Sequence, residues 1–210
     1  MSAFKMTVIG DSFAEGRGDP RPDGSFGGWV PELGRHLGIP ESEILNLGAF
    51  AAMTGDVIER QLPVALENPA PLMGVTVGGN DLVRDYARDR FRDNLRLILT
   101  SLIGDGRTVF TITYPDIPGR IPGLTAGQRD VLRRNFARGN ADIRAMVAEL
   151  DVLCLDMPTM PATADSAMWN PDGIHPSAAG HRQIGLAMAD LLRQARYSPS
   201  APRHAIKETR

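Results

Sequence analysis

Five short runs of apolar and β-branched residues, separated by longer amphipathic segments, constrain the possible folds of this chain most strongly. The runs cover residues 5–10, 43–48, 72–81, 108–114 and 152–156. Apolar runs of this length, bounded by glycine, are typical of buried strands. Strands that alternate with helices form a parallel sheet with helices on both faces. We therefore predict an α/β fold, a three-layer α/β/α sandwich around a five-stranded parallel sheet in the flavodoxin-like order 2-1-3-4-5.

The segments between these runs carry helix and loop signals. A helix is predicted over residues 85–103, where apolar residues recur on one stripe. Another begins after Thr125, which can form a capping box with Gln128. Further helices are expected over residues 29–37, 54–66 and 177–196. The segments rich in glycine and proline, expected to be loops, are residues 14–28, 115–123 and 157–171.

Composition narrows the class of protein. With 210 residues, of which 42% are hydrophobic and 23% charged, the chain is expected to form one soluble domain over residues 1–196. A polar, flexible tail is expected over residues 197–210. The net charge of -2 provides no attraction for nucleic acid or an anionic membrane, so neither is an expected partner. Cys154 lies in an apolar run and is expected to be a buried, unreactive thiol.

Targeting signals guide the expected location. The first strand begins within a few residues of Met1, which leaves no room for the charged and apolar regions of a secretory signal. No apolar run approaches the roughly 20 residues that span a bilayer. The default expectation is therefore a cytoplasmic protein.

Chemically useful groups follow three of the predicted strands. Ser12 follows Gly10, Gly48 ends the second run, and Asn80 follows the glycines of the third. In the order 2-1-3-4-5, these three strand ends are neighbours at the carboxyl edge of the sheet, where ligands bind in open α/β sheets. The N–H groups of Ser12 and Gly48 and the side-chain amide of Asn80 could then converge on a developing oxyanion.

A base for Ser12 is available near the end of the chain. Asp172 precedes His175 by three residues, and Pro176 marks the start of the final helix. At this spacing the carboxylate can accept a hydrogen bond from one ring nitrogen of His175, which leaves the other nitrogen free to take the Ser12 proton. The three residues together predict a nucleophile, a base and an orienting acid.

With these residues in place, the chain resembles the SGNH-hydrolase superfamily, also called the GDSL esterases and lipases. The resemblance rests on four sequence blocks, Gly10-Asp11-Ser12, Asn46-Leu47-Gly48, Gly78-Gly79-Asn80-Asp81 and Asp172 with His175. It implies that Ser12 is the nucleophile, that Asp172 and His175 complete the catalytic set, and that residues 1–196 form a catalytic domain. It also implies that Ser12, Gly48 and Asn80 are the oxyanion donors. The one departure is Phe13, where the family often has leucine.

The resemblance implies a serine esterase that works through an acyl-enzyme on a small-molecule ester, without a metal or organic cofactor. The moderate loops favour short-chain or acetyl esters of small soluble molecules or sugars. Two alternatives stay open. A metal-dependent phosphoesterase is the weaker, because only four histidines are present and no Asp-x-His follows the first strand. A binding domain without turnover on the same fold is the other.

Several neighbours of the blocks have structural interpretations. Asp11 and Asp81 are expected to hold their turns by local hydrogen bonds, and His181 is expected to pack or to cap a helix. The aromatic and sulfur side chains that flank the motif loops could line a substrate pocket or simply pack, and the sequence favours neither. These are Phe26, Trp29, Met168 and Trp169.

Overall fold

The computed structural model describes residues 4–104 and 106–197 and confirms the predicted sheet. Five parallel strands follow the order β2-β1-β3-β4-β5. Because β1 pairs with both β2 and β3, the carboxyl ends of these three parallel strands are adjacent, as predicted. The strands are β1 (Met6–Gly10), β2 (Ile44–Asn46), β3 (Leu72–Thr76), β4 (Thr108–Thr113) and β5 (Leu153–Asp156).

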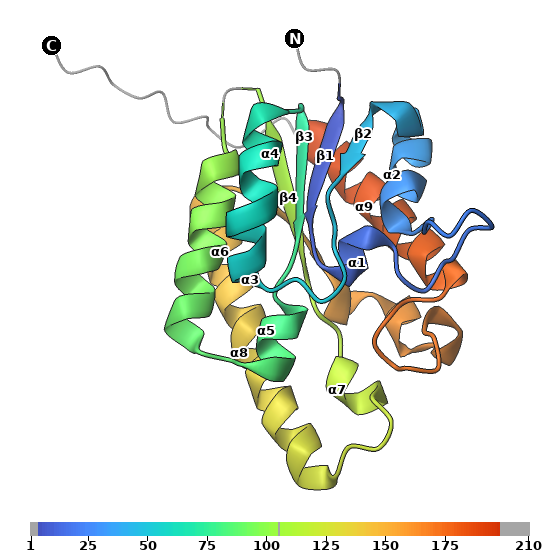
Figure 1. Cartoon of the computed structure of the whole chain (residues 1–210), viewed down its shortest axis with the longest axis vertical. Helices are drawn as coiled ribbons and strands as arrows, with labels where there is room; N and C mark the ends of the chain where they lie inside the picture. Colours follow the sequence, from blue (N-terminus) through green and yellow to red (C-terminus); the bar gives the residue numbers. More distant parts are fainter. Residues whose placement is uncertain (1–3, 105, 198–210) are drawn as a thin grey trace, which may run out of the picture.

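Helices cover both faces of the sheet. Figure 1 shows α2 (Trp29–Leu37) and α9 (Ala178–Tyr197) on one face, with α4 (Leu62–Glu67), α6 (Arg88–Leu102) and α8 (Ala126–Leu150) on the other. The predicted capping box at Thr125 starts α8. The short elements are α1 (Ser12–Glu15), α3 (Thr54–Asp56), a π-helical segment (Val57–Gln61), α5 (Gly79–Arg84), α7 (Ile117–Arg120) and 3-10 turns at Glu41–Glu43, Met157–Thr159, Pro161–Ala164 and Ser166–Met168.

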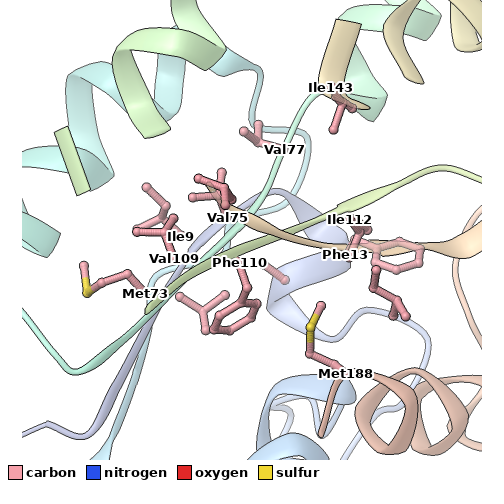
Figure 2. Close-up of a cluster of buried hydrophobic side chains, with 14 of the residues drawn as sticks. Ile9, Phe13, Met73, Val75, Val77, Val109, Phe110, Ile112, Ile143 and Met188 are labelled. Carbon is pink, nitrogen blue, oxygen red and sulfur yellow. The ribbon is translucent and has the colours of Figure 1, made fainter. Parts of the chain in front are cut away.

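The core lies on both sides of the three central strands. All residues of β1 and β3 are buried, as expected for parallel strands covered on both faces. Figure 2 shows side chains of β3 and β4 between Ile143 of α8 and Met188 of α9. A Cβ at Gly74 would lie 2.7 Å from the Phe110 ring. The absence of a side chain at Gly74 therefore makes room for a large aromatic in the centre of the sheet.

Some predicted boundaries were wrong. The third run is a strand only to Thr76, and residues 79–84 form α5, so the long helix that follows starts at Arg88 instead of residue 85. The segments 14–28 and 115–123 are not entirely loop, since α1 reaches Glu15 and α7 lies in the second of them. Helices this short are hard to predict because they contain little more than one turn of apolar periodicity.

Three further expectations concern the single cysteine, membrane-spanning segments and the end of the chain. Cys154 is only half-buried, whereas a buried thiol was expected, because β5 lies at the edge of the sheet. Burial still raises the pKa of its thiol to about 12, as expected for an unreactive cysteine. Within the described ranges, no helix combines the length and apolar character needed to cross a membrane. α9 ends at Tyr197, and residues 198–210 of the predicted tail lie outside the described residues.

Candidate active site

The turn after β1 holds Ser12 at the start of a short helix. The Asp11 side chain is the N-cap of α1, since its Oδ1 accepts the Phe13 N–H at 2.9 Å. The Asp11 N–H donates to the Thr76 carbonyl of β3 at 2.9 Å. A Cβ on Gly10 would lie 2.1 Å from that same carbonyl oxygen, so glycine permits this close approach of the two strands. Ser12 is consequently fixed at the carboxyl edge of the sheet.

Ser12, His175 and Asp172 form one hydrogen-bonded chain. Ser12 Oγ lies 2.9 Å from His175 Nε2, and His175 Nδ1 lies 2.7 Å from Asp172 Oδ2. A carboxylate can only accept at Nδ1, so that nitrogen carries the proton and Nε2 is free to accept the Ser12 proton. Ser12 and His175 are buried, with 8% and 9% exposure. This geometry suits transfer of the serine proton to the imidazole.

Hydrogen bonds within its own turn hold the Asp172 carboxylate in place. Its Oδ1 accepts the N–H groups of Ile174 at 2.8 Å and His175 at 3.0 Å, while Oδ2 faces the imidazole. Burial raises the pKa of Asp172, but the hydrogen bonds from His175 and Ile174 outweigh it and hold the pKa below its ordinary value. The carboxyl is therefore ionised at neutral pH, as an acceptor for Nδ1–H must be.

Asn170, which the sequence analysis did not single out, anchors the histidine turn. Its Nδ2 donates to the carbonyl of Pro176 at 2.7 Å and of Gly18 at 3.2 Å, which ties the turn to the loop after α1. Gly173 has a φ of +70°, and a Cβ there would lie 2.3 Å from the Arg120 carbonyl oxygen. Both contacts fix the position of His175 from outside the hydrogen-bonded chain.

The three predicted oxyanion donors differ in how free they are. The Ser12 N–H is in the first turn of α1, where no intrahelical acceptor exists. Asn80 lines a cavity with Ser12, and its Nδ2 donates to the Ala52 carbonyl at 3.0 Å, which uses one of two amide hydrogens. The Gly48 N–H instead donates to Asn46 Oδ1 at 3.1 Å. Gly48 is close to α1, but its donor is already paired.

Asn46 also connects this glycine to α1. Its Nδ2 donates to the Ala14 carbonyl at 2.7 Å, while its Oδ1 accepts from Gly48. A Cβ on Gly48 would lie 2.3 Å from the Glu15 nitrogen. The end of β2 and α1 are therefore in direct backbone contact, which only glycine allows.

Gln61 is a second residue that the sequence analysis missed. The side chain is buried, and its Nε2 donates to the Gly10 carbonyl at 2.8 Å while its Oε1 accepts the Gly10 N–H at 2.7 Å. The same carbonyl accepts the Ala49 N–H at 3.1 Å. One amide thus joins the π-helical segment to the ends of β1 and β2. The only sequence signal was a polar residue on a helix face that also contains Val57 and Ala65.

Asp11 and Asp81 were both expected to hold their own turns by local hydrogen bonds, and only Asp11 does so. Asp11 makes the predicted local bond to Phe13, but Asp81 accepts the Thr54 N–H at 3.0 Å and the Thr54 hydroxyl at 2.6 Å, from a distant helix. Burial raises the pKa of both carboxyls. The pKa of Asp11 reaches about 7, because the Phe13 N–H offsets burial only in part and the negative charge of Asp81 adds to it.

Asp11 should make stability depend on pH near neutrality. Its folded pKa of about 7 lies above the ordinary value of 3.8, so between these values the folded chain holds a proton that the unfolded chain has lost. The free energy of unfolding should therefore fall as pH rises, by about 4 kcal/mol in total. We expect Asp11→Asn to gain stability relative to wild type between pH 5 and pH 8, measured by denaturant unfolding at each pH.

The comparison between the two proteins isolates Asp11 from other groups. Burial lowers the pKa of His181, which acts in the opposite direction, but His181 is common to both. Asp23→Asn is the matched control, because a serine hydrogen bond lowers the pKa of this exposed carboxyl below the tested range. Parallel stability curves for wild type and Asp11→Asn would contradict the assignment.

The other neighbours of the sequence blocks pack within the structure and do not line the cavity beside Ser12. His181 is fully buried, accepts the Trp29 N–H at Nδ1 over 3.1 Å and donates from Nε2 to the Arg17 carbonyl over 3.0 Å, so it caps α2 as expected. Trp29, Met168 and Trp169 are buried in packing, and Phe26 lies beside the Arg17 guanidinium at 5.0 Å. None of these aromatic or sulfur side chains lines the cavity beside Ser12.

Comparison with known proteins agrees with this architecture. The sequence model of the GDSL-like Lipase/Acylhydrolase family matches residues 8–183. No curated protein matches. Among solved structures, the lipase/acylhydrolase from Enterococcus faecalis aligns with a TM-score of 0.68 at 20% identity, over 95% of this chain and 100% of that one. A catalytic mutant of Axe2, an acetylxylan esterase from Geobacillus stearothermophilus, aligns with a TM-score of 0.66 at 19% identity, over 92% and 94%. At these identities the structures show a shared fold.

Proposed function

Because the chain belongs to the GDSL-like lipase/acylhydrolase family, a family of ester hydrolases, we propose that it cleaves carboxylic esters through an acyl-enzyme on Ser12. The observation that carries the proposal is the continuous hydrogen-bonded chain from Ser12 Oγ through His175 to Asp172. A serine hydroxyl is a weak nucleophile until an adjacent base takes its proton, and this chain supplies that base in a fixed tautomer.

The reaction follows from that geometry. His175 Nε2 takes the Ser12 proton as Oγ attacks the ester carbonyl carbon, and the carbonyl oxygen becomes an oxyanion. His175 then gives the proton to the leaving alcohol as its C–O bond breaks, which leaves the acyl group on Ser12. Water repeats both steps and releases the carboxylic acid. Asp172 stabilises the imidazolium that forms in each half of the reaction.

The oxyanion is stabilised by the Ser12 N–H and the Asn80 side-chain amide, and the Gly48 N–H is a third candidate donor. The Ser12 N–H and the Asn80 amide are both available to donate to the oxyanion. The Ser12 N–H has no intrahelical acceptor, and Asn80 has a second amide hydrogen. The Gly48 N–H takes part only if it shares its hydrogen between Asn46 Oδ1 and the oxyanion. Each such donor contributes about 3 kcal/mol to the transition state.

The substrates are short-chain or acetyl esters of small soluble molecules or sugars. The cavity beside Ser12 has a volume of about 120 Å³, too small for a long lipid chain. The likeness in fold to an acetylxylan esterase is compatible with this class. The metal-dependent alternative finds less support, since residues 4–104 and 106–197 contain no group of three or more His, Cys, Asp or Glu side chains placed to hold a metal ion.

Covalent labelling tests the proposal and separates it from the binding-domain alternative. A small alkyl fluorophosphonate should modify the protein once, and mass spectrometry of the digest should place the adduct on Ser12. Ser12→Ala should not be labelled, whereas Ser25→Ala, at an exposed serine whose hydroxyl donates to Asp23 within its own turn, should be labelled like wild type. Labelling of another residue, or retained labelling in Ser12→Ala, would refute the nucleophile assignment.

A further inference from the structure

The cavity beside Ser12 has a composition and position that point to a specific part of the substrate. We propose that it binds the acyl group and limits that group to about four to six carbons, with Ile117 and Phe136 forming the closed end. This inference rests on the proposed esterase function and adds the residues that set acyl-chain length. Both residues lie outside the four sequence blocks, on α7 and α8.

The lining of the cavity is mainly apolar, and its most exposed apolar members mark the mouth. Val83 and Ile174 are 37% and 36% exposed, so they form the mouth. Tyr114, Ile117 and Phe136 are each 4% exposed, and unlike the similarly buried Asp11, Ser12 and Phe13 they do not belong to the turn after β1, so we assign the closed end to them. The other lining residues are Asp11, Ser12, Phe13, Gly79, Asn80 and Arg84.

The position of the catalytic groups decides which half of an ester enters. Ser12 and the oxyanion candidate Asn80 line the cavity, whereas His175 does not. The leaving oxygen must lie next to His175 Nε2 to receive its proton. The alcohol is therefore directed toward His175, and the acyl group, on the other side of the carbonyl carbon, is directed into the cavity.

The volume sets the length limit. A closed apolar cavity of about 150 Å³ in a protein core can hold a benzene molecule, so about 120 Å³ suits an alkyl chain of about four to six carbons. Each methylene buried in an apolar site raises kcat/KM by about fourfold until the space is filled. Beyond that length, the chain has to bend back into solvent.

At the closed end, a hydrogen bond holds Tyr114 in place, whereas Phe136 and Ile117 can be substituted. The Tyr114 hydroxyl accepts the Gly79 N–H at 3.1 Å, which fixes Tyr114 against the turn that carries Asn80. The Phe136 ring packs edge-on against the Tyr114 ring, with centroids 5.7 Å apart. Phe136 and Ile117 have purely apolar side chains, so they can be shortened without leaving a buried polar group unpaired.

A series of p-nitrophenyl esters from acetate to dodecanoate tests the proposal by kcat/KM. In wild type we expect a maximum between butyrate and hexanoate and at least a tenfold fall by decanoate. Phe136→Ala should move the maximum to longer chains by two to four carbons. Ile117→Phe, which fills the cavity instead of emptying it, should retain acetate hydrolysis and lose hexanoate hydrolysis, and it provides a second test if Phe136→Ala folds poorly.

The controls separate this inference from the esterase proposal. Ile143→Ala removes a buried side chain from the same helix as Phe136 but away from the cavity, and its chain-length profile should match wild type. An unchanged profile in both cavity variants would overturn the inference, as would a response only to the length of the alcohol in a series of alkyl acetates. Fluorophosphonate labelling of Ser12 that survives in these variants would show that the esterase assignment stands independently.

Discussion

Ser12→Ala and His175→Ala are each expected to reduce kcat for a short aryl ester by about five to six orders of magnitude, and the double variant by no more than either single variant. The reason is the single 2.9 Å contact between Ser12 Oγ and His175 Nε2. Without the oxygen there is no nucleophile for the imidazole to activate. Without the imidazole, the hydroxyl stays protonated and weak as a nucleophile. The two residues therefore act as one unit, and their losses do not add.

Single-turnover and steady-state rates of p-nitrophenyl butyrate hydrolysis provide the measurement. The variants need a stability control, because both residues are buried. Ser12→Ala should fold normally, since Asp11 still caps α1 through the Phe13 N–H, which does not involve the Ser12 side chain. Equal melting curves with additive losses of activity would contradict a shared mechanism. Activity within tenfold of wild type in either single variant would exclude that residue from the chemistry.

The sheet could be predicted from the sequence because buried parallel strands leave a direct signature. β1 and β3 are buried at every position, so their apolar runs are continuous, and the glycines that follow them mark the carboxyl edge. Asp172 and His175 could be paired in advance because three residues in a turn bring a carboxylate to an imidazole. The need of Ser12 for a base, and then the family blocks, connected this pair to Ser12, which is 163 positions from His175.

Contacts between distant segments were not predictable in this way. α5 has six residues and begins at Gly79, in the glycine pair just after β3. Its sequence therefore resembles the end of a strand. Gln61 pairs with Gly10 across 51 positions, and nothing local to either residue indicates the contact. The closed end of the cavity combines Ile117 and Phe136 from two helices. Such sites depend on how elements pack, whereas periodicity reports only which face of one element is buried.

The pairing of the Gly48 N–H illustrates the same limit at the site itself. Gly48 follows the end of β2 and lies beside α1, where a Cβ would be 2.3 Å from the Glu15 nitrogen. Yet the direction of its N–H depends on the Asn46 side chain, which accepts that hydrogen at 3.1 Å. A glycine can therefore be positioned from sequence, while the availability of its donor depends on a neighbouring rotamer.

Asp172→Asn is expected to lower kcat by about three to four orders of magnitude with little change in KM. The asparagine oxygen can still accept the N–H groups of Ile174 and His175, which now bond to Asp172 Oδ1. Its amide NH2 then faces His175 Nδ1, where the carboxylate oxygen is 2.7 Å away in wild type. Because two donors cannot face each other, the ring must place its proton on Nε2. That tautomer cannot take the Ser12 proton, although the local turn is preserved.

Asp165→Asn is the matched control for this effect. Asp165 Oδ1 accepts the Ala167 N–H at 2.9 Å and caps a 3-10 turn in the loop that leads to the histidine, so like Asp172 it accepts the backbone N–H two residues further on, but it does not bond to the imidazole. We expect its kcat to stay within about twofold of wild type, as for an exposed site without a catalytic contact.

The tautomer change in Asp172→Asn can be read from the histidine 15N chemical shifts, with Nδ1 changing from protonated to unprotonated. A large loss of activity without that change would mean that Asp172 acts through the shape of the turn, and equal losses in both variants would mean that the loop matters more than the carboxylate.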